Sequence, residues 1–90
     1  MEIIILPEAR ADLEYWKKSG NKRAISRITQ IVNSIKSDYK TGVGHPEPLK
    51  GNLEGFWSRR INKKNRIVYK PLEEEGRVLI LSLRGHYSDK

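Results

Sequence analysis

Glu47 lies between two prolines, in Pro46-Glu47-Pro48, and is the residue of this 90-residue chain that looks best placed for chemistry. Each proline fixes its own backbone angle and restricts the residue before it, so the carboxylate is on a stiff segment. Taken alone, the segment favours an ordinary surface loop whose prolines guide the chain into the sheet. It is followed by several cations, namely Lys50, Arg59, Arg60 and Arg66.

A second set of reactive groups follows the apolar run from Val78 to Leu83, in Arg84-Gly85-His86-Tyr87. One base, one acid and several cations are the groups needed to cleave RNA without a metal. The base removes the proton of the ribose 2′-hydroxyl, the acid protonates the departing 5′-oxygen, and cations stabilise the charge on the phosphate. The plain alternative is that the arginines are solvated on an exposed strand and His86 belongs to a frayed tail.

The elements that must position these groups begin with one strand and two helices. Residues 2–6 are rich in β-branched side chains and end at Pro7, which predicts a strand followed by a helix start. Apolar residues recur at helical spacing from Pro7 to about Ser19, and again from an Asn21 N-cap to about Tyr39. At this spacing we expect Trp16 to pack in the core rather than to stack on a base.

The basic residues of the second helix lie largely away from its apolar face. They suit a solvated surface and contact with RNA phosphates equally well. The residues are Lys22, Arg23, Arg27 and Lys36.

The second half of the chain has an extended pattern after a flexible, glycine-rich entry at 41–44. Strands are predicted at 49–53, 56–62, 66–70 and 77–84, joined by turns at 62–65 and 71–76. Alternation puts Arg60 and Arg59 on opposite faces, and cross-strand pairing brings Arg60 and Arg66 to one end of the sheet. Apolar residues on both faces of the last strand predict a central position for it.

Together these elements predict an α+β fold in a single domain spanning residues 1–90. It has an N-terminal strand and two helices packed on one face of a mostly antiparallel sheet of about five strands. The basic site occupies the other face.

Composition favours a polyanionic partner. Eighteen Lys and Arg residues against 11 Asp and Glu residues give a net charge of +7. The chain has no cysteine and two histidines, His45 and His86, so we expect neither a metal site nor a cofactor. The N-terminus lacks a secretion-signal pattern and no apolar stretch approaches membrane-spanning length, so we expect a cytoplasmic protein.

Five segments together resemble the YoeB toxins of the RelE/ParE superfamily: Gly44 to Lys50, Asn52-Leu53, Gly55 to Ile61, Arg66 to Tyr69, and His86-Tyr87. The resemblance implies a RelE-like fold and the toxin role in a type II toxin–antitoxin system. It also implies an mRNA interferase, that is, a ribosome-dependent endoribonuclease that cuts mRNA in the A site and inhibits translation. The implied partners are the ribosome, a cognate acidic antitoxin of YefM type and a second copy of the chain.

The resemblance also implies a role for each matching residue. Glu47 is the expected general base and His86 the general acid, since an unperturbed histidine has a pKa of about 6.5. Arg66 stabilises the transition state and Tyr87 orients the scissile nucleotide. The expected RNA-binding residues are Lys50, Arg59 and Arg60.

Two departures from the family pattern and two alternative functions remain. The turn Asn62-Lys63-Lys64-Asn65 is basic where acidic or mixed residues are expected. The chain continues beyond Tyr87 through Ser88-Asp89-Lys90, so Tyr87 has no free carboxylate. ParE-like toxins share the fold but poison DNA gyrase, and a non-catalytic nucleic-acid-binding module is a further alternative. Neither function needs an acid and a base, so Glu47 and His86 occurring together with Arg66 favour the RNase.

Overall fold

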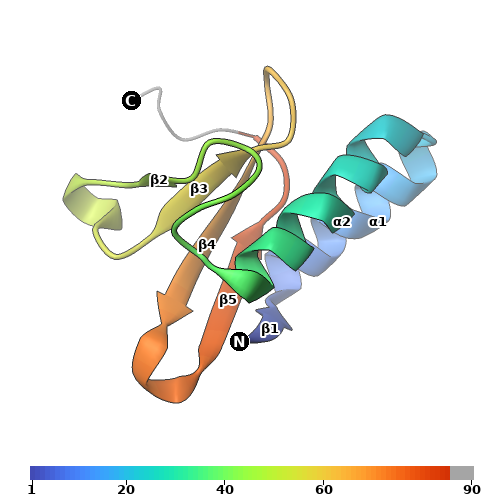
Figure 1. The fold of residues 1–90 in the computed structure, drawn as a ribbon. Helices are drawn as coiled ribbons and strands as arrows, with labels where there is room; N and C mark the ends of the chain where they lie inside the picture. Colours follow the sequence, from blue (N-terminus) through green and yellow to red (C-terminus); the bar gives the residue numbers. More distant parts are fainter. Residues whose placement is uncertain (86–90) are drawn as a thin grey trace.

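The computed structural model describes residues 1–85, in which two helices pack on a five-stranded sheet (Figure 1). The elements in chain order are β1 (Glu2–Ile5), α1 (Pro7–Ser19), α2 (Lys22–Ser37), β2 (Glu47–Pro48), a 3₁₀ turn (Gly51–Leu53), β3 (Trp57–Arg60), β4 (Arg66–Leu72), a second 3₁₀ turn (Glu73–Glu75) and β5 (Arg77–Ser82). The strand order is β1-β5-β4-β3-β2. β1 runs parallel to β5, and the other neighbours are antiparallel. The predicted α+β class is confirmed.

Local sequence signals account for the ends of both helices. Pro7 begins α1, where its missing N–H costs no hydrogen bond. Gly20 ends α1 in the left-handed conformation with φ 72°, which glycine adopts without strain. Asn21 caps α2, because its side-chain oxygen accepts a hydrogen bond from the N–H of Ala24 at 3.0 Å.

The core lies between the helices and one face of the sheet. Its buried side chains include Ala9 and Trp16 of α1, Ile28, Ile31 and Ile35 of α2, Ile67 and Tyr69 of β4, and Val78 and Ile80 of β5. Trp16 is 4% exposed, so its predicted packing role is confirmed. The strand β5 lies between β1 and β4, which confirms its predicted central position.

The predicted strand at 49–53 is wrong, and the strand instead comprises Glu47 and Pro48. Gly51 takes φ 66°, and the N–H of Leu53 turns back to the carbonyl of Lys50 at 3.2 Å. This local bond replaces an extended backbone with a 3₁₀ turn. Glu47 therefore lies on a strand of the sheet, paired with Ser58.

The last two strands also differ from the predicted bounds. β4 continues through Pro71 to Leu72, two residues beyond the prediction. Pro71 is tolerated there because β3 pairs with β4 only as far as Tyr69, so no neighbour on that side needs its N–H. β5 ends at Ser82, since the next N–H, that of Leu83, donates to Asp12 of α1.

Neither helix of the described chain is long and apolar enough to cross a membrane.

Candidate active site

Three neighbouring strands bring Glu47 and Arg66 together. Glu47 of β2 pairs with Ser58 of β3, and Arg60 of β3 pairs with Arg66 of β4. The predicted placement of Arg60 and Arg66 at one end of the sheet is therefore confirmed. Glu47 Oε1 lies 4.0 Å from Arg66 Nη1, which is an ion pair but too long for a hydrogen bond.

Arg66 keeps an unused hydrogen-bond donor in this pair. Its side chain is 18% exposed, whereas that of Glu47 is 62% exposed. The Nη1 atom of Arg66 is buried and has no hydrogen-bond partner within the described chain. A buried donor without a partner is costly, so a guanidinium in this state favours an incoming anion. The carboxylate beside it is open to solvent and can accept a proton.

A row of small buried residues crosses the sheet beside this pair. Ser58, Val68 and Ser82 hold matching register positions on β3, β4 and β5. All three side chains are buried, and Ser82 Oγ has no hydrogen-bond partner in the part of the chain that is described. Sequence reasoning missed Ser82. Its signal was a hydroxyl inside an otherwise apolar run.

Arg59 is not at the surface, although it was expected to bind RNA. The residue is fully buried and points to the helix side of the sheet. Its guanidinium donates five hydrogen bonds within the protein, at 2.7 to 3.1 Å, and the acceptors are the Tyr69 hydroxyl, Ser34 Oγ and the carbonyls of Asp38, Thr41 and Val43. With no free donor and no exposed surface, Arg59 positions the α2–β2 loop instead. The expectation that it contacts RNA was wrong.

The α2–β2 loop fits closely around Arg59 and the end of β3. The carbonyl of Gly44 accepts a hydrogen bond from the N–H of Arg60 at 2.7 Å. A Cβ on Gly44 would lie 3.1 Å from the Cβ of Arg59, and Gly44 has φ 90°. His45 takes φ 56°, which is uncommon for a residue with a side chain. Because Glu47 follows two residues later, this anchored loop fixes the backbone position from which the Glu47 side chain extends.

A largely open surface cavity of about 610 Å³ adjoins Glu47. It is lined by Arg27 of α2, by the loop residues Gly42, Val43, Gly44, His45 and Pro46, by Glu47 and by Arg60 of β3. Arg60 and Lys50 are both exposed, as RNA-binding residues must be, but Lys50 does not line the cavity. His45 had not been expected in the site, whereas Arg27 was one of four basic helix residues considered for contact with RNA phosphates.

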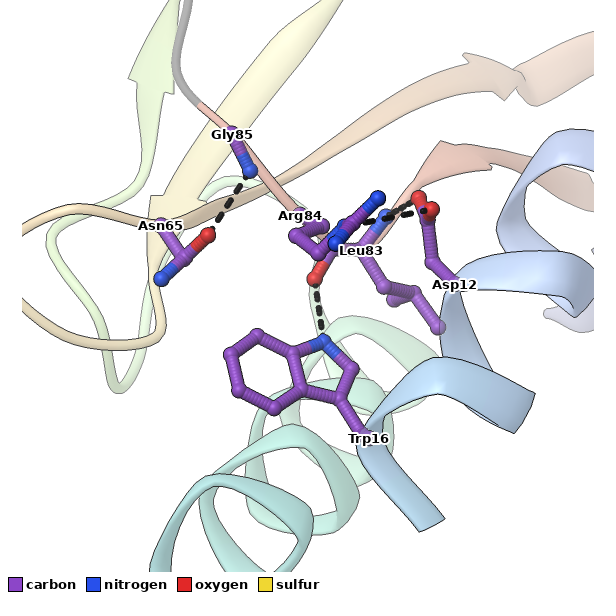
Figure 2. A network of polar contacts seen from close by, with 6 residues as sticks. All are labelled: Asp12, Trp16, Asn65, Leu83, Arg84 and Gly85. Atoms are coloured by element: carbon purple, nitrogen blue, oxygen red, sulfur yellow. Dashed lines mark hydrogen bonds and ion pairs between the residues drawn. The ribbon is translucent and has the colours of Figure 1, made fainter. Parts of the chain in front are cut away.

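The segment after β5 is held from two sides (Figure 2). From α1, Trp16 Nε1 donates to the carbonyl of Leu83 at 2.8 Å, and Asp12 Oδ2 accepts from the N–H of Leu83 at 2.9 Å. From the β3–β4 turn, Asn65 Oδ1 accepts from the N–H of Gly85 at 2.8 Å. The carbonyl of Gly85 in turn accepts from the N–H of Arg66 at 2.8 Å.

This arrangement fixes the path of the chain directly beside Arg66. His86 and Tyr87, the expected acid and orienting residue, lie outside the described residues.

Burial and local hydrogen bonds perturb the titration of groups around the loop. Burial raises the pKa of Tyr69, although its bond from Arg59 opposes this. Burial also raises the pKa of Tyr39. The N–H of Lys40 donates to Asp38 at 2.8 Å and lowers the pKa of that carboxyl group.

Residues 1–85 hold no group of three or more histidine, cysteine, aspartate or glutamate side chains placed to bind a metal ion.

Comparison with known proteins identifies the family. The model of the "YoeB-like toxin of bacterial type II toxin-antitoxin system" matches residues 6–87. The chain belongs to this family. Toxin YoeB of Mycobacterium bovis is 42% identical over 81 residues, which cover 90% of this chain and 92% of that protein.

Solved YoeB structures share the fold. A YoeB/ParE toxin from Agrobacterium tumefaciens gives a TM-score of 0.90 at 32% identity, covering 97% of this chain and 100% of that one. The Staphylococcus aureus YoeB dimer gives a TM-score of 0.84 at 34% identity. The YoeB–YefM complex from the same organism gives a TM-score of 0.83 at 35% identity. Both S. aureus matches cover 97% of this chain and 98% of the other. The RelE-like fold and the toxin family predicted from sequence are confirmed.

Proposed function

We propose that this YoeB-like toxin is a ribosome-dependent mRNA endoribonuclease that inhibits translation in the cytoplasm. The observation that supports this best is the pair formed by exposed Glu47 and half-enclosed Arg66, 4.0 Å apart, with a guanidinium N–H left unpartnered among the described residues. A proton acceptor next to an unused cationic donor is what attack on a phosphodiester requires.

In the proposed reaction the ribose 2′-oxygen attacks the adjacent phosphorus. Glu47 takes the 2′-hydroxyl proton, a 2′-O–P bond forms, and the bond between phosphorus and the 5′-oxygen breaks. His86 gives a proton to the departing 5′-oxygen, which leaves as a hydroxyl, and the other fragment ends in a 2′,3′-cyclic phosphate.

Arg66 stabilises the extra negative charge on the phosphate in the transition state, which is where such a donor contributes most to the rate. Lys50 and Arg60 bind flanking phosphates, and Tyr87 orients the scissile nucleotide. No added divalent metal is needed for the chemical step.

The proposed partners follow from charge and from the relatives. A chain with a net charge of +7 suits the ribosome and mRNA. We include a YefM-like antitoxin, because the S. aureus YoeB was solved in complex with YefM, and expect an acidic segment of it to fold over the site. We also include a second copy of this chain, since a YoeB dimer was solved from the same organism.

The decisive test is an mRNA with deoxyribose at the scissile nucleotide, presented on purified ribosomes. This substrate lacks the nucleophile and should resist cutting while binding normally, and ordinary mRNA should give the cyclic phosphate or the derived 3′-phosphate. Cutting of the deoxy substrate at the normal rate would refute the mechanism. Loss of gyrase supercoiling activity without any RNA cleavage would point to a ParE-like function instead.

A further inference from the structure

The cavity beside Glu47 extends the site onto a helix. Glu47 and Arg60 form part of its lining, and Arg27 reaches it from α2. A volume of about 610 Å³ lies within the ordinary range of ligand-binding pockets. The space is therefore large enough for one nucleotide unit next to the residues of the proposed reaction.

Two guanidiniums on this cavity are available to a ligand. Arg27 is half-buried and Arg60 is exposed. None of the ion pairs within residues 1–85 involves either of them. Arginine binds phosphate through two parallel N–H donors, and two arginines from separate elements can hold one phosphate between them.

The loop that lines the cavity together with the two arginines is in place before any ligand arrives. The loop 42–46 has positive φ at Gly42, Gly44 and His45, and the strained one is His45, since it carries a side chain. Arg59 holds the carbonyls of Thr41 and Val43 from beneath. A preformed wall lowers the entropy lost on binding, so it favours a ligand that must be placed accurately.

We propose that this cavity binds one backbone phosphate of the RNA substrate, next to the scissile phosphate, with Arg27 and Arg60 on either side of it. This inference rests on the proposed function, because the ligand is the same RNA strand that reaches Glu47. Its new content is the role of Arg27 as a substrate-binding residue contributed by α2. An acidic antitoxin side chain is the competing occupant.

The first test measures binding of the Arg27→Gln variant to ribosomes programmed with the uncleavable deoxy mRNA. We expect roughly tenfold weaker binding. The slope of log affinity against log salt should become shallower by about one unit. The single-turnover rate at saturating protein should be unchanged, because Arg27 contacts no reacting atom. Arg27→Lys should recover part of the affinity, since it keeps the charge but loses the two-pronged contact.

The matched control is Lys36→Gln, which removes the same charge from the same helix. Lys36 is exposed and nine positions further along, on about the opposite side of α2. It should weaken binding less than about twofold, as expected for a distant screened charge. Thermal unfolding should show both variants folded. Equal losses for the two variants would mean that Arg27 contributes only general charge, which would overturn the proposal.

The second test identifies the phosphate. Uncharged methylphosphonates are placed one at a time at the phosphates flanking the scissile one. At a single position, the methylphosphonate should reduce the affinity of the wild type as much as Arg27→Gln reduces the affinity for unmodified mRNA. The variant with this modified mRNA should bind no more weakly than with either change alone. Additive losses at every position would overturn the Arg27 contact while leaving cleavage by the wild type, and so the proposed function, intact.

Two other outcomes separate the remaining readings. A wild type that neither binds nor cuts programmed ribosomes would refute both the proposed function and this inference. A variant with unchanged ribosome binding but weakened affinity for the antitoxin would assign the cavity to the acidic peptide and overturn the RNA proposal.

Discussion

Arg59 Nε donates a hydrogen bond to the hydroxyl of Tyr69 at 3.0 Å, in the interior on the helix side of the sheet. The Tyr69 hydroxyl donates onward to the carbonyl of Tyr39 at 2.7 Å. A buried cation is thus satisfied by neutral groups, most of them backbone carbonyls of the loop that leads to Glu47. Stability and the position of the carboxylate depend on the same side chain.

Replacing Arg59 tests this dependence. Arg59→Met removes five hydrogen bonds and leaves partly buried carbonyls without donors, so we expect the free energy of unfolding to fall by about 3–5 kcal/mol. Urea denaturation measures it. Arg60→Met, an exposed neighbour, should cost less than about 0.5 kcal/mol. Equal decreases in the free energy of unfolding for the two variants would contradict the buried role of Arg59.

Alkaline pH should destabilise the fold through Tyr69. Burial raises its pKa in the folded state above the unfolded value of 10.0, so the native state holds the proton more tightly. The associated stability is complete below about pH 10 and is lost as the pH rises through the folded pKa. The check is the urea midpoint between about pH 9 and 11.5. Tyr69→Phe, though less stable at neutral pH, should show a smaller alkaline loss, and an unchanged alkaline loss would refute the assignment.

Asn65 should matter for cleavage more than for stability. Its side-chain oxygen accepts a hydrogen bond from the N–H of Gly85, and the carbonyl of Gly85 accepts one from the N–H of Arg66. Asn65→Ala removes two exposed side-chain hydrogen bonds, one from the N–H of Gly85 and one to Asn62 Oδ1, and should cost about 1–2 kcal/mol. We expect the single-turnover rate to fall by at least about tenfold, since small displacements of reacting groups lower the rate strongly. Asn52→Ala, an exposed asparagine in the Gly51–Leu53 turn, is the control. Equal rates for the two variants would exclude a positioning role.

Substitutions in the proposed acid and base should act on the chemical step. Glu47→Gln keeps the shape but cannot take a proton, and it should slow single-turnover cleavage on ribosomes by roughly 10² to 10⁴. His86→Ala should do the same, and Arg66→Ala should do comparable damage by leaving the transition-state charge unpaired. Glu54→Gln, an exposed acid outside the site, should leave the rate unchanged. Full activity of Glu47→Gln or His86→Ala would refute the assigned roles.

Sequence patterns predicted the elements better than the path of the chain between them. Helical spacing and capping residues placed α1 and α2 closely, because these signals are local. The short strand at Glu47 and the turn at Gly51 escaped prediction, because a two-residue strand exists through pairing with β3 rather than through any pattern of its own.

The candidate site shows the same division. Alternation correctly placed Arg59 and Arg60 on opposite faces, and pairing across the turn placed Arg60 beside Arg66. The sequence could not show that one arginine would be buried among carbonyls, since a buried and a surface arginine look alike in a basic chain. The contribution of Arg27 depends on how α2 packs near the loop, which is a tertiary property.

The pairing of β1 with β5 determines when, during synthesis, the protein can complete its fold. The first strand finds its partner at the far end of the chain, in register from Glu2 with Arg77 to Ile5 with Ile80. Asp12 and Trp16 likewise form hydrogen bonds with the backbone of Leu83, which is synthesised much later. Such distant contacts cannot form while the ribosome still holds the last strand, so the N-terminal half has no completed core on which to fold during synthesis. Folding of the toxin is therefore completed only after β5 has emerged from the ribosome.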